Sequence, residues 1–209
     1  MKTIPILESE REQESLPSPD GRYAWLGPGF LLTLSALAAA SVTLACPPAR
    51  AQVLHSKESA LRLAFPSADH VQPRTFFLTE EQKTAVERRA GGSIDSRMIT
   101  CYVGTHGTDL LGYAFFETHV VRTLPATFMV VLDPSGRIRA VHILAFHEPS
   151  DYLPPERWLR QFAGRHLGRT LAVGQDIVGI AGSSLSSQAV TAGVRRVLAL
   201  YELLLRRPE

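Results

Sequence analysis

The sequence predicts a single α+β domain: a mainly antiparallel sheet flanked by helices, with a long C-terminal helix after a serine-rich motif. Four segments in the middle of the chain are rich in β-branched and aromatic residues and are joined by short connections, which is typical of hairpin-linked strands. A capping signal before them and an apolar stripe after them indicate helices on both sides. A composition of 45% apolar and 20% charged residues is ordinary for a globular protein.

Residues 1–51 differ in composition from the rest of the chain. From Tyr23 to Cys46 there is no charged residue, and Ala49-Arg50-Ala51 then forms an A-x-A pattern of the kind that signal peptidase cuts. The uninterrupted apolar part, Phe30 to Cys46, has about seventeen residues, the short limit for a membrane span. We therefore expect either a signal peptide cleaved before Gln52 or an uncleaved membrane anchor. Both would export the domain to the periplasm or the outer face of the cytoplasmic membrane.

Residues 52–96 are predicted to be an N-terminal helical region. Residues 56–65 have the pattern of a short amphipathic helix. Thr79-Glu80-Glu81-Gln82 is a capping box, so we expect a second helix that continues to about Arg89 and ends at Gly91-Gly92.

The following part, residues 97–209, is predicted to be the main domain. It begins with four strands that alternate with turns, and Asp133-Pro134-Ser135-Gly136 is a turn signal with proline second and glycine fourth. The expected strands are 97–103, 111–119, 126–132 and 137–146.

Two helices are expected after the strands. The first begins at Pro154-Pro155, because proline is tolerated in the first turn of a helix, and ends at Gly164. The second continues from Leu185 to about Leu205 and carries one apolar stripe at three- and four-residue steps. The stripe consists of Val190, Val194, Val197, Tyr201 and Leu204.

The stretch Gly182-Ser183-Ser184-Leu185-Ser186-Ser187 places four serines at the start of this last helix. Free backbone N–H groups and the positive end of the helix dipole meet there, which favours binding of an anion such as a phosphate. Gly182 allows the backbone to approach a ligand closely. The alternative is a serine that only caps the helix, and composition alone favours that interpretation.

The order of residues from Asp176 to Thr191 resembles the flavinylation motif of the FMN-binding domain family, approximately D-x-D-A-V-S-G-A-T-L-S-S-x-A-V. That domain occurs in subunits of the Na⁺-translocating NADH:quinone reductase and of Rnf-type complexes, and in nitrous-oxide-reductase regulators. In such proteins a flavin transferase uses FAD to esterify FMN, through its phosphate, to the threonine of the motif. The resemblance implies a covalent FMN on Ser184, which stands where the family has that threonine.

The resemblance extends over roughly residues 97–205. Gly112-Tyr113-Ala114-Phe115 and the turn at 133–136 follow the family's order, His147-Glu148-Pro149 is similar to its H-x-E-T-P loop, and Trp158 to Phe162 is similar to its F-x-x-Q-F helix. The resemblance and the helix start together assign cofactor binding to eight residues. These are Ser184, Gly182, Ser183, Leu185, Ser186, Ser187, Glu148 and His147.

The chain departs from the family motif at four positions. Ser184 and Ser183 replace threonine and alanine, Ala181 replaces a serine or threonine, and Val178 replaces the second aspartate. Serine offers the same hydroxyl chemistry as threonine. We expect an electron carrier or redox subunit that depends on a flavin transferase and on membrane-associated redox partners. Two alternatives stay open, a degenerate subunit without flavin that has a structural or binding role in a membrane complex, and a reductase that binds FMN non-covalently.

Several other functions are not expected. The net charge is +2 and the arginines are scattered, whereas a nucleic-acid interface needs a dense basic stripe. Of the two cysteines only Cys101 lies in the domain, where it is expected to be a buried packing residue, so neither a disulfide nor a multi-cysteine zinc site is expected. No histidine pair has H-x-x-x-H spacing, and no G-x-S-x-G elbow of a serine hydrolase is present.

Overall fold

The structure, a computed structural model, describes residues 52–168 and 170–206. Six antiparallel strands form one sheet in the order β1-β6-β5-β4-β3-β2, which confirms the predicted fold class. The predicted leader, residues 1–51, lies outside the described residues. The strands are β1 (Gln52–Val53), β2 (His70–Phe77), β3 (Met98–His106), β4 (Asp109–Val120), β5 (Pro125–Leu132) and β6 (Ile138–Phe146).

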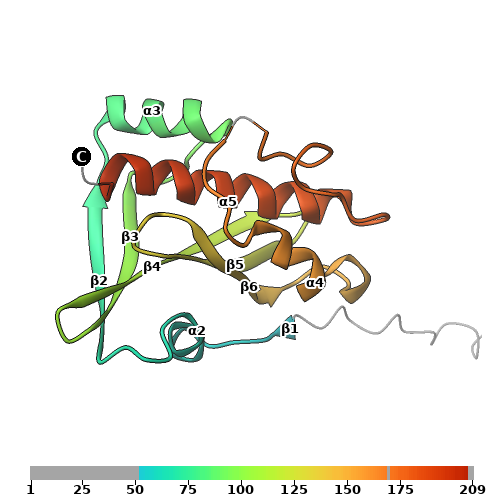
Figure 1. The fold of residues 1–209 in the computed structure, drawn as a ribbon. Helices are drawn as coiled ribbons and strands as arrows, with labels where there is room; N and C mark the ends of the chain where they lie inside the picture. Colours follow the sequence, from blue (N-terminus) through green and yellow to red (C-terminus); the bar gives the residue numbers. More distant parts are fainter. Residues whose placement is uncertain (1–51, 169, 207–209) are drawn as a thin grey trace, which may run out of the picture. The chain divides into compact units, whose positions relative to one another are not determined.

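Helices cover both faces of the sheet. Figure 1 shows α3 and α5 on one face and α2 on the other. Among residues 52–168 and 170–206, no helix is long and apolar enough to cross a bilayer. The α-helices are α2 (Lys57–Ala64), α3 (Glu80–Ala90), α4 (Glu156–Leu159) and α5 (Ser184–Leu204), with 3₁₀ turns η2 (Ser150–Tyr152) and η3 (Arg160–Phe162).

The larger apolar core lies between the sheet and α5. Val194 and Val197 of α5 pack into one buried cluster with Phe115 and Phe128 of the sheet. A smaller cluster on the opposite face joins Phe65, at the end of α2, to β4, β5 and β6. Burial of apolar surface on both faces stabilises the sheet by about 25 cal/mol per Å².

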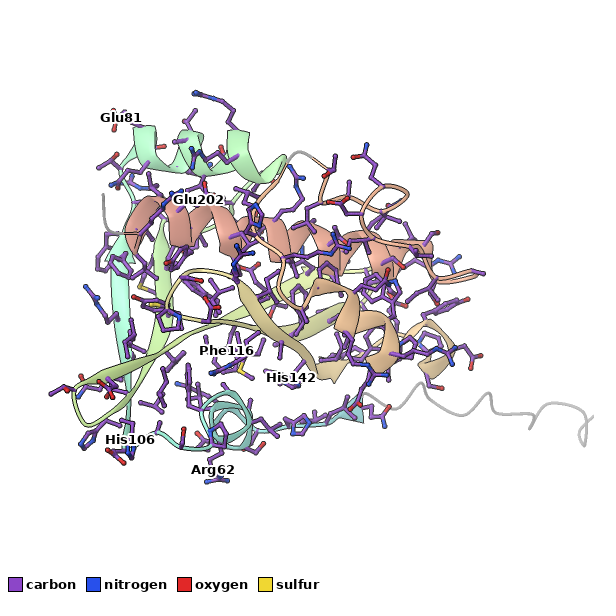
Figure 2. All side chains as sticks on the ribbon, in the orientation of Figure 1. Arg62, Glu81, His106, Phe116, His142 and Glu202 are labelled. Atoms are coloured by element: carbon purple, nitrogen blue, oxygen red, sulfur yellow. The ribbon has the colours of Figure 1, made fainter. Side chains whose placement is uncertain are left out.

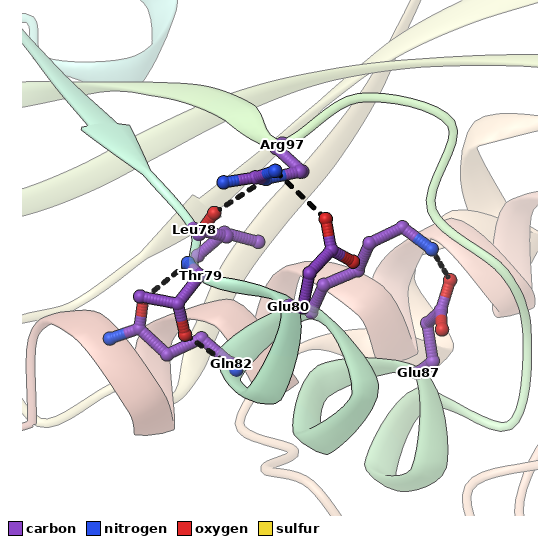
Figure 3. Close-up of polar contacts among 7 residues, drawn as sticks. Leu78, Thr79, Glu80, Gln82, Glu87 and Arg97 are labelled. Carbon is purple, nitrogen blue, oxygen red and sulfur yellow. Dashed lines mark hydrogen bonds and ion pairs between the residues drawn. The ribbon is translucent and has the colours of Figure 1, made fainter.

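The predicted capping box at the start of α3 is confirmed (Figure 3). The Thr79 hydroxyl accepts a hydrogen bond from the Gln82 N–H at 3.2 Å, and the Gln82 side chain accepts one from the Thr79 N–H at 3.0 Å. Arg97, just before β3, donates to the Leu78 carbonyl at 2.8 Å and pairs with Glu80 at 2.8 Å. The start of α3 is thus tied to the start of β3.

Strand β2 was not predicted, because Pro73 lies in its middle. The Leu78 N–H donates to the Arg97 carbonyl, and in this register bonded residues alternate along β2. Pro73 therefore takes a position that faces away from β3, where no N–H is needed, as expected for proline on an edge strand. The two helices predicted for residues 52–96 are both present, and β2 lies between them.

The long helix α5 packs closely on β4. A Cβ atom at Gly193 would lie 2.8 Å from Nε2 of His119, so the helix approaches the sheet there as only glycine allows. One turn further, Arg196 donates to the Glu117 carboxylate at 3.2 Å, and His119 lies 3.0 Å from the same oxygen. These contacts fix α5 on the sheet and so determine where its first turn, with the serines, is held.

Candidate functional site

The first turn of α5 has backbone donors without partners. Ser183 is the N-cap residue, but its side chain makes no capping hydrogen bond. The first N–H to bond back into the helix is that of Ser187, to the Ser183 carbonyl at 3.1 Å. In the described part of the chain, the N–H groups of Ser184, Leu185 and Ser186 have no acceptor. Such N–H groups, together with the helix dipole, form an anion-binding position.

These N–H groups lie beside a small pocket. Its volume is about 150 Å³, and residues 182–186 line it on one side. The opposite side comes from Val121 and Arg122, in the turn between β4 and β5, and from Glu148 and Tyr152. The turn and the start of α5 are far apart in the sequence, so the pocket forms only in the folded sheet.

The four serines have different environments. The Ser183 hydroxyl donates to the Asp151 carbonyl at 3.2 Å. The fully buried Ser187 hydroxyl donates to the Ser183 carbonyl at 3.0 Å and accepts from the Ile180 N–H at 3.1 Å. Both side chains therefore stabilise the loop that enters α5.

Ser184 and Ser186 remain available to a ligand. Ser184 is exposed, whereas Ser186 is only 1% exposed. Within the described ranges neither hydroxyl makes a side-chain hydrogen bond like those of Ser183 and Ser187, and both residues line the pocket. The two hydroxyls can therefore donate to a group bound in the pocket.

Glu148 organises the opposite wall. Its Oε1 accepts hydrogen bonds from three consecutive N–H groups, those of Arg122 at 3.1 Å, Thr123 at 2.7 Å and Leu124 at 2.8 Å. The N–H groups of Thr123 and Leu124, and then that of Arg122, hold the pKa of the Glu148 carboxyl below its usual value. The buried carboxylate therefore fixes the turn between β4 and β5.

That turn places Arg122 against the pocket. No hydrogen bond or close ion pair of the guanidinium is found within 52–168 or 170–206, although its positive charge helps to lower the pKa of the nearby Glu148 carboxyl. An arginine guanidinium is always charged and binds phosphate oxygens in a forked geometry. Arg122 was missed by the sequence analysis, since nothing near it in the chain distinguishes it from the other scattered arginines.

Of the eight residues expected at the site, Glu148 and residues 182–186 line the same pocket. Ser187 is buried behind it. His147 is half-buried, its N–H donates to the Pro125 carbonyl at 3.2 Å, and it does not line the pocket. The helical segment around Trp158 contributes differently, by holding the chain that leads to the serines.

That leading segment is held by its backbone. Trp158 Nε1 donates to the Val178 carbonyl at 2.5 Å, and the Gln161 side-chain oxygen accepts from the Val178 N–H at 2.9 Å. The Val178 side chain itself is 70% exposed. Asp176 is held by Thr170, whose hydroxyl donates to its carboxylate at 2.7 Å. The path of the chain into α5 therefore does not depend on the side chain at 178.

The pocket has the size of a phosphate group, and its donors are Arg122 and the N–H groups of the first turn of α5. Ligand pockets for cofactor-sized molecules are usually about 300–1,000 Å³, so a pocket of about 150 Å³ holds an anionic group but not a whole flavin. Two exposed apolar side chains lie on the segments that form it: Leu185, 47% exposed, lines the pocket, and Leu124, 38% exposed, follows Arg122 in the turn between β4 and β5. A phosphate in the pocket would leave an attached ring system on this apolar rim.

Comparison with known proteins adds no assignment. No protein-family model matches the sequence, and no curated protein matches it with significant similarity. Within the described ranges, no group of three or more histidine, cysteine or acidic side chains has a geometry that could hold a metal ion. The function is therefore argued from the pocket and from the motif that enters it.

Proposed function

We propose that this chain is an exported flavoprotein that carries FMN as a phosphoester on Ser184 and transfers electrons between redox partners. The observation that carries the proposal is the exposed Ser184 hydroxyl beside a pocket that is lined by the first turn of α5, with its free N–H groups, and by Arg122. The motif from Asp176 to Thr191 points to the same serine. Membrane-associated proteins are the proposed electron donors and acceptors.

The attachment step conserves atoms and charge with FAD as donor and a flavin transferase as catalyst. The Ser184 oxygen forms a bond to the flavin-side phosphorus of FAD, the phosphoanhydride bond breaks, and AMP leaves while the serine proton is released. Arg122 and the N–H groups of the first turn of α5 stabilise the negative charge of the phosphate. Glu148 acts as a positioning residue, since its carboxylate already accepts three N–H groups of the Arg122 turn.

A covalent bond suits an exported protein. Free flavin is scarce outside the cytoplasm, so a reversibly bound cofactor would be lost by mass action. Bound FMN would supply one- and two-electron transfer, whereas the protein would place and orient it. Because the pocket has room for the phosphate only, the ring would lie on the rim near Leu185 and Leu124. An exposed ring favours exchange of electrons with partner proteins over catalysis on a small substrate.

The test is mass spectrometry of the denatured full chain after co-expression with a flavin transferase. We expect a mass increment of FMN less one water in the wild type, none in Ser184→Ala, and a retained increment in Ser184→Thr. Ser183→Ala is the matched control, because the Ser183 hydroxyl donates to the Asp151 carbonyl and lies outside the proposed reaction. Arg122→Ala is expected to lower the modified fraction severalfold.

Each other outcome selects an alternative. An increment that persists in Ser184→Ala contradicts the assignment of the bond. Flavin that is released on denaturation supports a reductase with non-covalent FMN. A protein without flavin in the wild type and in Ser184→Thr supports a degenerate structural subunit.

A further inference from the structure

The outer edge of β6 is only partly covered. At one end, the N–H groups of Leu54 and His55 both donate to the Leu144 carbonyl, at 2.8 and 3.2 Å. At the other end, Ile138 exchanges two hydrogen bonds with the segment after η3, at 2.9 Å to Arg165 and 2.7 Å from Gly164. Between these contacts, residues 139–143 have no neighbouring strand on this side in the described structure.

The register shows which backbone groups face this gap. Pro125 accepts from the His147 N–H, and Asp133 donates to the Arg137 carbonyl, so the odd-numbered residues of β5 bond to β6. Met129 is opposite His142 and Val131 is opposite Ala140, which makes these two the hydrogen-bonded pairs. Val141 and Ile143 therefore point their N–H and C=O groups away from β5. Within residues 52–168 and 170–206, no hydrogen bond joins these groups to a partner outside the sheet.

A groove follows this free edge. Its volume is about 470 Å³, and it is lined by His55 at one end, by residues 139–143 along β6, and by the segment 153–163 on the opposite side. The side chains of Val141 and Ile143 are buried in the core under α5, so these residues offer the groove their backbone. Figure 2 shows His142 on the α2 face of the sheet, next to this region.

We propose that the groove binds an extended segment of a partner protein, which adds to the sheet as a short strand beside β6. Residues 139–143, which have no strand on their outer side, span roughly 16 Å at about 3.3 Å per residue. This length is enough for three or four residues of an added strand. Main-chain hydrogen bonds to Val141 and Ile143 would give affinity, as in other cases of strand addition. The apolar lining, which includes Leu159 and Leu153, would take the alternate side chains.

The charged side chains that line the groove indicate which kind of partner segment would bind there. Arg160 lines the groove, is exposed, and forms no ion pair within the described ranges. Arg139 also lines it, with its guanidinium bonded to the Ala64 and Leu111 carbonyls, and Glu156 has the only carboxylate among the lining residues. Burial lowers the pKa of His142, so this lining side chain adds no fixed positive charge, and Arg160 is the group that sets the charge of the groove. The segment is therefore expected to carry an acidic side chain between two apolar residues. An opposite charge on the partner raises both specificity and the rate of association.

The first test is residue-resolved hydrogen exchange on the full chain by NMR. The amides of Val141 and Ile143 should exchange faster than those of Ala140 and His142, whose N–H groups bond to β5. Addition of the peptide acetyl-Thr-Val-Glu-Val-Thr-amide at millimolar concentration should shift the resonances of Val141 and Ile143 and slow their exchange. The same peptide with N-methylated valines lacks the backbone donors and should shift neither.

Variants then test the charge. Arg160→Glu should weaken binding of the glutamate peptide at least threefold and favour a peptide with lysine in its place. Arg157→Glu is the matched control, since Arg157 is exposed on α4, directly before η3, and does not line the groove. Ala163→Phe should fill the groove and abolish binding of both peptides. Equal protection of all four amides in the free protein, or no shift at β6 with either peptide, would overturn the proposal.

Discussion

The turn at Asp133–Gly136 offers a test of how α5 is seated on the sheet. Gly136 has φ +82°, and a Cβ atom there would lie 2.6 Å from Cζ of the Tyr201 ring, in α5. Tyr201 in turn donates its hydroxyl to the Pro134 carbonyl at 2.9 Å. Gly136→Ala therefore introduces both backbone strain and overpacking. Gly174→Ala introduces only the strain, because Gly174 has φ +84° and no atom within 4 Å of the added carbon.

The expected loss of stability in each glycine variant follows from these two costs. A left-handed conformation costs a non-glycine residue roughly 1–2 kcal/mol, and overpacking a filled site costs about 1–3 kcal/mol. Gly136→Ala should then lower the free energy of unfolding by about 3 kcal/mol, and Gly174→Ala by about 1.5 kcal/mol. At about 2–4 °C per kcal/mol for a chain of this size, the two melting temperatures should differ by roughly 3–6 °C.

The assay is thermal unfolding followed by circular dichroism, with a double-mutant cycle. In the background Tyr201→Ala, where the ring is absent, Gly136→Ala should cost no more than Gly174→Ala does in the wild type. Equal losses for the two glycine variants, or an unchanged cost of Gly136→Ala without the Tyr201 ring, would refute the proposed close packing of α5 on the turn.

Two further predictions concern ionisable groups. Burial raises the pKa of the Cys101 thiol to about 11, so iodoacetamide at about pH 8 should alkylate Cys101 only after unfolding in guanidinium chloride. Peptide mapping separates this site from Cys46, and rapid alkylation of Cys101 in the native protein would contradict its burial. The N–H groups of Thr123 and Leu124 hold the pKa of Glu148 in the folded protein below its usual value of 4.5. The ionised carboxylate therefore stabilises the fold at pH values above 4.5, and this stabilisation is lost as the pH falls through the folded-state pKa. The melting temperature of Glu148→Gln should therefore lie below that of the wild type near neutral pH and converge with it on acidification, whereas a constant difference would show that the charge has no such role.

Local signals predicted much of the fold because they act within a few residues. The capping box at Thr79 and the apolar stripe of α5 are both set by nearby side chains, and both are confirmed. The strand at Pro73 could not be predicted, since only its pairing with β3 puts that proline on the outer edge. The single helix predicted between Pro154 and Gly164 is instead divided into α4 and the 3₁₀ turn η3.

The sequence predicted one side of the candidate site, and of the opposite wall only Glu148. The serine stretch is contiguous, so its place at a helix start follows from the sequence. The opposite wall includes the turn between β4 and β5, whose backbone N–H groups donate to the Glu148 carboxylate. Because those contacts join distant segments, neither Arg122 nor the positioning role of Glu148 has a signal in the sequence.

A departure from the flavinylation motif could affect either the fold of the segment or its recognition by another protein, and the structure distinguishes these two effects at position 178. Trp158 and Gln161 hold both backbone groups of Val178, so a lost carboxylate at that position leaves the path into α5 unchanged. Under the proposed function, the difference would concern the side chains that a transferase recognises, and not how this chain folds. If the transferase requires the missing carboxylate, Val178→Asp should increase the modified fraction of Ser184 while the melting temperature stays the same, since the side chain at 178 is exposed. An increase in both quantities would instead place the defect in the fold of the segment.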